Sequence, residues 1–550
     1  MSASSKKKLR NEERNAKLTE RQLAEQKEAK KLKLYTTIFA VVMVVLLVVA
    51  VVFGITNFIS NSGNRERNTV AVTVGEHEIS NAEYNYYFID SINALFSGDN
   101  SYMLQLGLLD TSLPLDEQVN PLNGQNWAEY VMEYAAQNIT SNYALVDAAK
   151  AAGYTISEDV QLEIDTLISN QEFYASMYGY SDVDSFLKAS YGKGASLESY
   201  RQYVETSMLS QAYYNEYVSS LDFEESDLRA KEAEGYNKFS SFTYNYYYLT
   251  ASKFLEGGNT DADGNTTYTD EETAASIKAC EEAAKSLIGD EITTAEELDA
   301  AISALSINAG SETPVTSTLY SDTLYTNIAS QEVAEWISAE NRKEGDKVVL
   351  PNEVTSTDAK GNTVNSINGY YVLFFHGSDD NTFALKNARH ILAAFEGGSY
   401  DSATGITTYS DEEKAAAKAA AEDLLAQWKA GDATEESFAA LANEHSADGD
   451  GTTGGLYEDI YPGQMVPAFD LWCYDDSRKA GDTGIVETEY GFHVMYFSEN
   501  SETTYRDYMI ENQLRNDAVT SWYNGLVESV SVVEGDTSYV YTDVVLGGSN

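Results

Sequence analysis

The pattern of hydrophobic and polar positions begins with one long apolar run. Ile38 to Ile55 are 18 residues without a charged or strongly polar side chain. At 1.5 Å per residue such a run crosses the ~30 Å hydrocarbon core of a bilayer, so it predicts a transmembrane helix over 35–59. Cleaved signal peptides have shorter apolar regions that end in small residues. Because this run ends in Phe53-Gly54-Ile55, we expect an uncleaved anchor.

After a short polar linker, the spacing indicates one strand and then a series of helices. The alternating, β-branched residues 70–74 predict a strand. Ser80 has the residue type and position of a helix N-cap. Apolar residues then recur at helical spacing, as at Trp127 and Val131. These patterns predict a mostly helical domain over 65–235.

The middle of the chain contains an internal repeat. Five scaffold positions recur at one spacing, which chance does not readily produce: Trp336, Arg342, Lys343, Gly345 and Asp346 recur 136 residues later as Trp472, Arg478, Lys479, Gly481 and Asp482. A helix-opening capping box also recurs, at 268–272 and 409–413. Each copy has the pattern strand, helix, helix, loop and strand, which predicts two α+β domains over 236–380 and 384–500.

The end of the chain is predicted to hold one more helix. Tyr505 to about Val527 is amphipathic, and a polar segment rich in β-formers follows it. The segment 501–550 is therefore treated as a C-terminal helix and tail.

Charge is distributed very unevenly along the chain. Residues 1–34 contain 11 Lys and Arg against 5 acidic residues, whereas the rest contains 25 against 82. The basic segment before the apolar run predicts a cytoplasmic N-terminus and an extracytoplasmic remainder, anchored in the cell membrane by a single span. So acidic a surface repels phosphate backbones, which argues against nucleic-acid binding.

Cysteine and histidine are scarce, which restricts the possible chemistry. Cys280 and Cys473 are the only cysteines and fall in different predicted domains, so we expect two buried thiols without a disulfide. The five histidines do not pair with cysteine or each other at metal-ligand spacing. We therefore predict neither a metal nor a cofactor.

The second repeat carries a set of motifs that resembles one known family. The set comprises Ala388-Arg389-His390-Ile391-Leu392, Ser446-Ala447-Asp448, Gly454-Gly455-Leu456-Tyr457, 463–469 and Tyr490-Gly491-Phe492-His493. Together these motifs resemble the parvulin-type peptidyl-prolyl isomerases, which rotate X-Pro peptide bonds between cis and trans. That reaction requires no nucleophile, metal or cofactor, but an apolar pocket and a few oriented polar groups.

The resemblance implies a role for each of eight residues. His390 and His493 fall at the family's two core histidines, which share a hydrogen bond between adjacent strands. Asp448 falls near the position of the reacting carbonyl, and Tyr490 precedes the Gly-x-His motif. The resemblance places these four in the catalytic set and the other four in substrate binding: Met465 and Phe469 in the proline pocket, with Leu456 or Tyr457 on its wall.

The first repeat lacks these side chains. By the repeat spacing, Tyr247 and Tyr371 replace the two histidines, and Asn308 replaces the aspartate. Ala329 and Val333 stand opposite the two proline-pocket residues. We therefore interpret the first repeat as a degenerate copy without isomerase activity, which leaves peptide binding or a spacer role open.

The layout of the whole chain resembles membrane-anchored foldases of the PrsA/SurA type. This resemblance implies α+β architecture with a transmembrane helix, a helical chaperone domain and two tandem parvulin-like domains, and a C-terminal helix that packs back on the helical domain. It implies an isomerase and foldase acting on X-Pro bonds of newly exported, unfolded polypeptides. The alternative is a holdase chaperone that binds unfolded chains without catalysis. Glu396 and Asp401 follow His390 without a nearby base, which disfavours phosphorylated substrates.

Overall fold

A computed structural model describes six stretches of the chain: 63–97, 102–260, 266–357, 363–401, 405–449 and 451–546. They form two compact units, one from the described residues up to Asp222 together with those from Arg515 onward, and one over Phe223–Leu514. Within the described stretches no helix has the length and apolar character to cross a membrane. The predicted basic segment and transmembrane helix, 1–34 and 35–59, lie outside the described residues.

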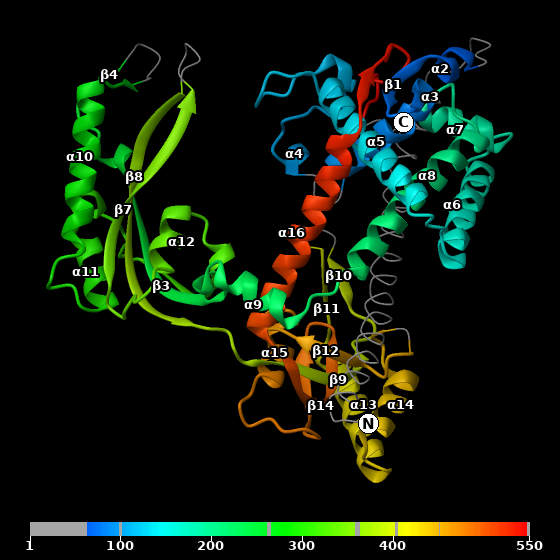
Figure 1. Cartoon of the computed structure of the whole chain (residues 1–550). Helices are drawn as coiled ribbons and strands as arrows, with labels where there is room; N and C mark the ends of the chain where they lie inside the picture. Colours follow the sequence, from blue (N-terminus) through cyan, green and yellow to red (C-terminus); the bar gives the residue numbers. More distant parts are fainter. Residues whose placement is uncertain are drawn as a thin grey trace. The chain divides into compact units, whose positions relative to one another are not determined.

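The first unit is mostly helical and is called the helical unit below (Figure 1). Its elements are α2 (Asn64–Asn68), β1 (Val70–Val74), β2 (His77–Ser80), α3 (Asn81–Phe96), α4 (Tyr102–Gln105), α5 (Trp127–Ala151), α6 (Glu158–Met177), α7 (Val183–Tyr191), α8 (Leu197–Ser220), the C-terminal part of α16 (Tyr505–Ser529) and β15 (Val532–Glu534). Ser80 accepts a hydrogen bond from the backbone N–H of Glu83 and so caps α3, as its residue type predicts.

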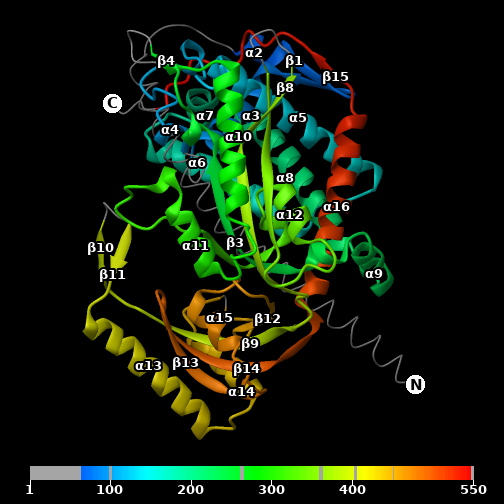
Figure 2. The same ribbon diagram turned by 90° about the vertical axis from the view of Figure 1, so that its left-hand side faces the viewer.

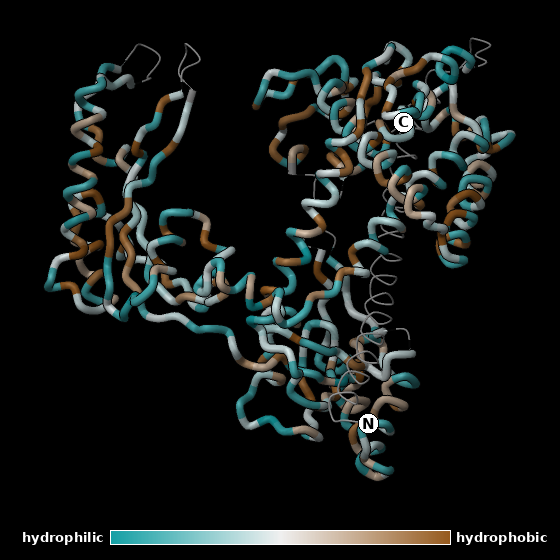
Figure 3. Tube along the Cα trace, in the orientation of Figure 1, coloured by the Kyte–Doolittle hydropathy of each residue, from teal (hydrophilic) through white to brown (hydrophobic). Residues whose placement is uncertain are grey.

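The helical unit has a core in which large aromatic side chains are buried. Trp127, Tyr86, Phe88 and Phe186 are almost inaccessible to solvent. Each such side chain stabilises the fold by about 1.5–3 kcal/mol through removal of apolar surface from water. Hydrophobic positions recur among hydrophilic ones along the helices (Figure 3), as expected for amphipathic helices packed on a shared core.

The C-terminal segment returns to the helical unit, as the sequence predicts. β15 pairs with β1 in a three-stranded antiparallel sheet of order β15-β1-β2. Trp522 of α16 stacks on Tyr217 of α8 with the ring centroids 3.8 Å apart. Buried Asn81 donates its side-chain amide to the carbonyls of Thr69 and Asp536, which ties the tail to the start of α3.

The second unit contains two β-sheet domains, which we call the first and second β domains. A short helix, α9 (Glu225–Ala233), precedes them. The first β domain comprises β3 (Ser241–Thr250), β4 (Asn259–Thr260), β5 (Thr266–Thr267), α10 (Asp270–Ser286), α11 (Ala295–Ala304), β6 (Thr318–Leu324), α12 (Gln331–Ile337), β7 (Lys347–Thr357) and β8 (Thr363–Asp379). The second comprises β9 (Ala384–Ala394), β10 (Ser399–Asp401), β11 (Ile406–Thr408), α13 (Asp411–Ala430), α14 (Glu435–His445), β12 (Leu456–Ile460), α15 (Pro467–Cys473), β13 (Thr483–Thr488) and β14 (Gly491–Thr504).

The two β domains have the same architecture. Their four-stranded antiparallel sheets have the orders β6-β3-β8-β7 and β12-β9-β14-β13, so corresponding strands occupy corresponding places. In the first, α10 and α11 pack on one face and α12 on the other. In the second, α13 and α14 pack on one face and α15 on the other (Figure 2). The chain therefore has an α+β fold with a helical N-terminal region and β-sheet domains.

The repeated scaffold residues make the same contacts in both β domains. The guanidinium of Arg342 lies 3.7 Å from the ring centroid of Trp336, and that of Arg478 lies 4.1 Å from Trp472. In each pair the arginine Nε also donates to the tryptophan carbonyl. Gly345 and Gly481 have φ of 85° and 88°, a left-handed conformation that glycine adopts without strain. The repeat seen in the sequence is thus a repeat of three-dimensional contacts.

The strand register corrects one position of the sequence comparison. Gly491 pairs with Ala394 and His390 with Met495, whereas Gly369 pairs with Thr250 and Tyr246 with Leu373. The residue at the place of His390 is therefore Tyr246, not Tyr247. Tyr247 points to the opposite face, where it packs with α10 and α11. The prediction was wrong by one residue, and one residue changes the face of a strand.

Candidate functional site

Two buried histidines lie at the centre of the second β domain. His390 is on β9 and His493 is on β14, and these strands are adjacent and antiparallel. Their Nδ1 atoms lie 2.9 Å apart, so the hydrogen bond expected from the sequence is present. Only 3% of His390 and 5% of His493 is exposed, so both rings form the floor of the site.

The histidine pair is extended by a polar side chain at each end. Asp448 Oδ2 lies 3.1 Å from His390 Nε2, and Thr488 Oγ1 lies 2.8 Å from His493 Nε2. A carboxylate accepts only, so His390 Nε2 carries a proton. With both rings neutral, His493 then donates to His390, and the hydroxyl of Thr488 donates to His493. Every polar atom of this chain, called the histidine network below, has a partner.

Burial determines the charges in the histidine network. Desolvation, followed by the repulsion that a protonated His390 would exert, lowers the pKa of His493 to about 4. The hydrogen bond from His390 lowers the pKa of Asp448, against the opposing effect of its partial burial. At neutral pH His493 is therefore uncharged and Asp448 is an anion. Because 41% of the Asp448 side chain is exposed, this fixed negative charge is accessible to a substrate.

An aromatic and sulfur-containing wall lies over the histidine network. The ring of Phe469 on α15 stands edge-on to both histidines, with centroids 5.5 Å from His390 and 5.7 Å from His493. Tyr457 on β12 donates its hydroxyl to Asp448 Oδ2 over 3.1 Å. Met465 is half-buried in the same cluster. Phe469 is only 2% exposed, so Tyr457 and Met465 are the wall residues that a substrate can touch.

Local sequence explains why β12 and α15 can approach the histidines. Gly455 accepts a hydrogen bond from the backbone N–H of His390. A Cβ on Gly455 would come within 2.1 Å of the carbonyl oxygen of His390, and its φ is 64°. Only glycine fits this close approach without strain. Pro467 in the first turn of α15 favours the start of the helix that carries Phe469.

The structure brings six of the eight predicted residues together and leaves two outside. Side chains alternate along a strand, and because Tyr457 faces the site, Leu456 faces away from it. Tyr490 lies in the turn between β13 and β14, with 58% of its surface exposed. Its backbone rather than its ring is used there, since its N–H donates to Thr488 and its carbonyl accepts from Phe395.

Thr488 is the functional residue that the sequence reasoning missed. It stands five residues before His493, and the tight turn between β13 and β14 folds it back beside that ring. The signal available in the sequence was a short hydroxyl side chain just before the Tyr-Gly turn. That signal identifies the residue only once the two strands are known to form a hairpin.

The corresponding face of the first β domain has different chemistry. Tyr246 and Tyr371 stand at the places of His390 and His493, with ring centroids 5.6 Å apart. Val333 on α12 is buried where α15 carries Phe469. Asn308 donates to the hydroxyl of Tyr247, so its side chain is directed toward α10 and α11. The polar contacts of this domain differ in kind: Tyr371 lies beside Ser330 and Glu332 on this face, and a chain from His376 through Asn245 and Ser317 to Asp299 lies elsewhere in the domain.

The described residues of the two β domains can be compared with the ligand sets that metal ions require. Among the described residues no group of three or more His, Cys, Asp or Glu side chains is arranged to hold an ion. Cys280 and Cys473 are separate buried thiols, and burial raises the pKa of Cys280 to about 11. The chemistry of the site therefore rests on the histidine network and its wall.

Comparison with known proteins identifies the second β domain. Residues 376–501 match the family model of the PPIC-type PPIASE domain, Rotamase_3. Over 68 residues the chain is 37% identical to foldase protein PrsA 1 of Listeria innocua, a match that covers 12% of this chain and 23% of that protein. The chain thus matches less than a quarter of that relative's length.

Two solved structures are also similar over part of the chain. The PrsA peptidylprolyl isomerase of Bacillus anthracis is 20% identical, with a TM-score of 0.17, over 27% of this chain and 59% of its own. PrsA of Bacillus subtilis is 23% identical, with a TM-score of 0.17, over 26% of this chain and 50% of its own.

Proposed function

Because residues 376–501 form a parvulin-type, PPIC-type domain, we propose that this protein is a peptidyl-prolyl cis/trans isomerase and foldase. Its substrates are X-Pro bonds in unfolded, newly exported polypeptides. The observation that carries the proposal is the complete network from Asp448 through both histidines to Thr488, beneath an apolar wall. No cofactor or metal takes part.

The reaction requires the enzyme to weaken one partial double bond. The barrier to rotation is about 18–20 kcal/mol and arises from amide resonance. The proline ring packs against Met465 and Tyr457, which holds one side of the bond while the rest of the substrate rotates. Binding energy from these contacts favours catalysis only where it is greater for the twisted amide than for the planar one.

Asp448 supplies the electrostatic contribution in this proposal. The resonance form of an amide places negative charge on the carbonyl oxygen, so a nearby carboxylate disfavours that form and with it the C–N double bond. The hydrogen bonds from His390 and Tyr457 fix the orientation of the carboxylate. The two histidines act as positioning residues, since both are too deeply buried to meet the substrate.

We assign the first β domain as a degenerate copy of the same domain. Its strand order and Arg–Trp contacts match those of the second β domain, but Tyr246 and Tyr371 replace the histidines. Without the two histidines, and with Asn308 directed to the opposite face in place of Asp448, it holds polypeptide or acts as a spacer. This loss of chemistry is the observation that favours the alternative function, a holdase that binds unfolded chains without turnover.

One assay separates the two functions. Full-length protein is mixed with a proline-containing peptide, and cis/trans exchange is followed by NMR. Catalysed exchange that disappears in Asp448→Asn supports the isomerase. Binding of the peptide without faster exchange supports the holdase and overturns the isomerase.

The location of the protein is part of the proposal. The excess of Lys and Arg in residues 1–34 and the apolar run that follows favour a cytoplasmic N-terminus with the folded units outside the cell membrane. Protease added to intact spheroplasts should then degrade the β domains. Protection of these domains until the membrane is lysed would overturn the proposed location.

A further inference from the structure

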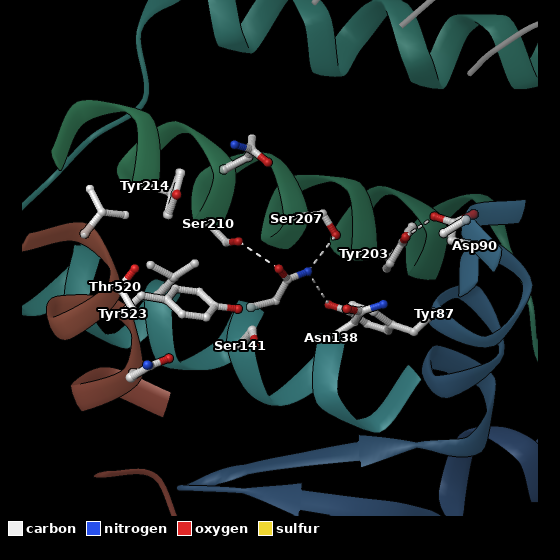
Figure 4. A pocket seen from close by; sticks show the side chains of 16 residues that line it. Tyr87, Asp90, Asn138, Ser141, Tyr203, Ser207, Ser210, Tyr214, Thr520 and Tyr523 are labelled. Carbon is white, nitrogen blue, oxygen red and sulfur yellow. Dashed lines mark hydrogen bonds between the residues drawn. The ribbon is translucent and has the colours of Figure 1, made fainter. Parts of the chain in front are cut away.

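A polar cavity lies within the helical unit, far along the chain from the histidine network. Its volume is 690 Å³, and it is lined by α3, α5, α8 and the C-terminal half of α16 (Figure 4). Asp90 and Tyr203 lie at one end of the cavity, and Thr520 and Tyr523 lie at the other. A volume of this size is in the range of small-ligand sites, which is about 300–1,000 Å³.

The lining of the cavity is suited to peptide groups. Side-chain amides and hydroxyls come from every helix around it, and Asn142, one of the lining residues, is fixed by three hydroxyls. The amide of Asn142 donates to the hydroxyls of Tyr87 and Ser207 and accepts from that of Ser210. A rigid row of donors and acceptors matches the N–H and C=O groups of an extended chain, whatever its sequence.

Asp90 is the only charged residue among the 16 that line the cavity. Its carboxylate accepts a hydrogen bond from the hydroxyl of Tyr203. No positively charged side chain in the described part of the chain forms an ion pair with it. The titratable groups that surround Asp90 are the tyrosines Tyr87, Tyr191, Tyr200 and Tyr203.

An isolated carboxylate in such a place is energetically unfavourable. Desolvation raises the pKa of Asp90 to about 6, and only the Tyr203 hydrogen bond opposes the shift. As a whole residue Asp90 is nevertheless half-buried, and it is part of the cavity lining. A cation that enters would find an unpaired anion in a region of low dielectric, where a charge-assisted hydrogen bond is strong.

We propose that this cavity binds the guanidinium group of an arginine in an unfolded polypeptide segment, with Asp90 as its counter-ion. Tyr87 and Tyr203 line the cavity beside the carboxylate, and an aromatic lining suits the planar, weakly hydrated guanidinium better than an ammonium. The peptide groups on either side of the arginine pair with Asn142 and its neighbours. The net charge of −51 attracts basic segments toward the protein before they bind.

The choice of a polypeptide as occupant rests on the proposed function, whereas the guanidinium site itself does not. The competing ligand is a free small molecule that carries a guanidinium group. The test therefore measures binding to the full-length chain by calorimetry with three probes. They are an unstructured, proline-free peptide with one central arginine, its twin with citrulline in place of arginine, and N-acetyl-arginine amide.

The peptide with arginine is expected to bind at least tenfold more tightly than the citrulline twin, because one charge-assisted hydrogen bond is lost. Equal affinities for the twins would overturn the proposal. The amino-acid amide should bind much more weakly than the peptide. Binding as tight as that of the peptide would replace the polypeptide by a free guanidinium compound as the ligand.

Two variants locate the site. Asp90→Asn keeps the shape of the side chain, and it should lower affinity for the arginine peptide about tenfold while leaving the citrulline peptide unaffected. Glu172→Gln, on the exposed surface of α6, removes one charge outside the cavity and is the matched control. Unchanged binding by Asp90→Asn, or equal losses in both variants, would overturn the assignment.

A second pair of variants keeps the test independent of any folding defect in Asp90→Asn. Ala94 is exposed, lines the cavity and lies one helical turn after Asp90. Ala94→Lys places an ammonium beside the carboxylate at the i,i+4 spacing, so it should abolish binding of the arginine peptide. Ala94→Gln has a similar length without the charge and should keep at least part of the affinity. If Ala94→Lys binds like the wild type, Asp90 is not the counter-ion.

Isomerisation measured on a proline peptide without basic residues separates this inference from the proposed function. Asp90→Asn should leave that rate unchanged. A protein that binds the arginine peptide through Asp90 but fails to accelerate isomerisation would overturn the isomerase and not the cavity. The opposite result would overturn the cavity alone.

Discussion

The first and second β domains share a scaffold and differ in almost every side chain at the site. Both have an arginine over a tryptophan ring, and both have a glycine N–H that donates over 2.8 Å to a strand carbonyl, from Gly345 to Phe375 and from Gly481 to Phe497. The face that carries His390 and His493 in the second carries Tyr246 and Tyr371 in the first. Folding and chemistry therefore depend on separate residues, so one can be retained when the other is lost.

The difference also shows what the histidine network requires. Its four members come from β9, β13, β14 and the segment after α14, and each buried polar atom is satisfied by the next. Replacing one member alone would leave a buried donor or acceptor without a partner, at a cost of about 1–3 kcal/mol. The first β domain avoids that cost because tyrosine rings fill the place and Tyr248 turns its hydroxyl to Asn352 at the edge.

The largest expected effect is a loss of activity confined to the second β domain. Asp448→Asn combined with Met465→Ala should reduce isomerisation by the full-length protein to the uncatalysed rate, because both the fixed charge and the proline contact are removed. Tyr371→Phe in the first β domain should leave the rate unchanged. NMR exchange rates on one proline peptide check both. Comparable losses in the two variants would mean that the first β domain is also catalytic.

The second-largest expected effect is a loss of stability, which we compare at the equivalent core positions 469 and 333 of the two β domains. Phe469→Ala should lower the free energy of unfolding of the second β domain by about 3–5 kcal/mol, because a buried ring leaves a cavity. Val333→Ala should cost less, because valine buries fewer carbon atoms. Pulse proteolysis in urea, with the fragments identified by mass spectrometry, reports each domain separately. Only Phe469→Ala should also impair isomerisation, and an equal loss of activity in Val333→Ala would contradict the comparison.

The histidine pair should give the second β domain a stability that depends on pH. The pKa of His493 is lowered to about 4, so the folded domain disfavours the protonated ring. Above the unfolded-state pKa of about 6.5, protonation of His493 does not reduce the free energy of unfolding. As the pH falls from 6.5 toward 4, the free energy of unfolding decreases by about 1.4 kcal/mol per pH unit, because the unfolded chain binds the proton and the folded domain does not. Asp448, whose pKa is also lowered, adds a further loss at lower pH.

The variant His493→Ala tests whether this pH dependence of stability arises from His493. At pH 7.5 it should reduce the free energy of unfolding by about 1–3 kcal/mol and reduce activity, since His390 loses its partner. Between pH 6.5 and 4 the wild type should lose more stability than the variant, measured by the same proteolysis in urea. Parallel pH profiles for the two proteins would show that His493 is not held neutral by the fold.

The smallest expected effect concerns the charge of the substrate. A phosphate on Ser-Pro adds about −1.5 to −2 charges near the carboxylate of Asp448. The nearest arginine, Arg389, is already bound to Glu435 and to two carbonyls. The phosphorylated peptide should therefore be isomerised several-fold more slowly than its unmodified twin at low salt, with a smaller difference near 0.15 M salt. Faster turnover of the phosphorylated peptide would show that these charges do not govern substrate choice.

Several features of the fold could be predicted because their signals are local or repeated. The capping boxes at Thr269 and Ser410 form as their sequences indicate, since each satisfies backbone groups within one turn of helix. The pairing of His390 with His493 and the nearness of Asp448 followed from the family resemblance.

The error at Tyr247 has its physical origin in strand register. A slip of one residue exchanges the two faces of a strand, and the offset between the repeats is not constant along the chain, being 141 at the capping boxes and 136 at the five scaffold positions. Sequence spacing therefore pointed to Tyr247 where the structure has Tyr246. Leu456 and Tyr490 lie outside the site for other reasons: Leu456, the alternative to Tyr457, faces the other side of β12, and Tyr490 lies in an exposed turn.

The sequence by itself determined the repeated scaffold and the helical region, because these depend on periodicity and repetition, and its resemblance to the parvulin family supplied most of the residues of the site. Only the tertiary structure decided that Thr488 completes the histidine network, that β15 pairs with β1, and that Asp90 stands without a cation in a polar cavity. The first of these depends on a hairpin. The other two bring together segments hundreds of residues apart, and no local pattern encodes which distant side chains or strands will meet.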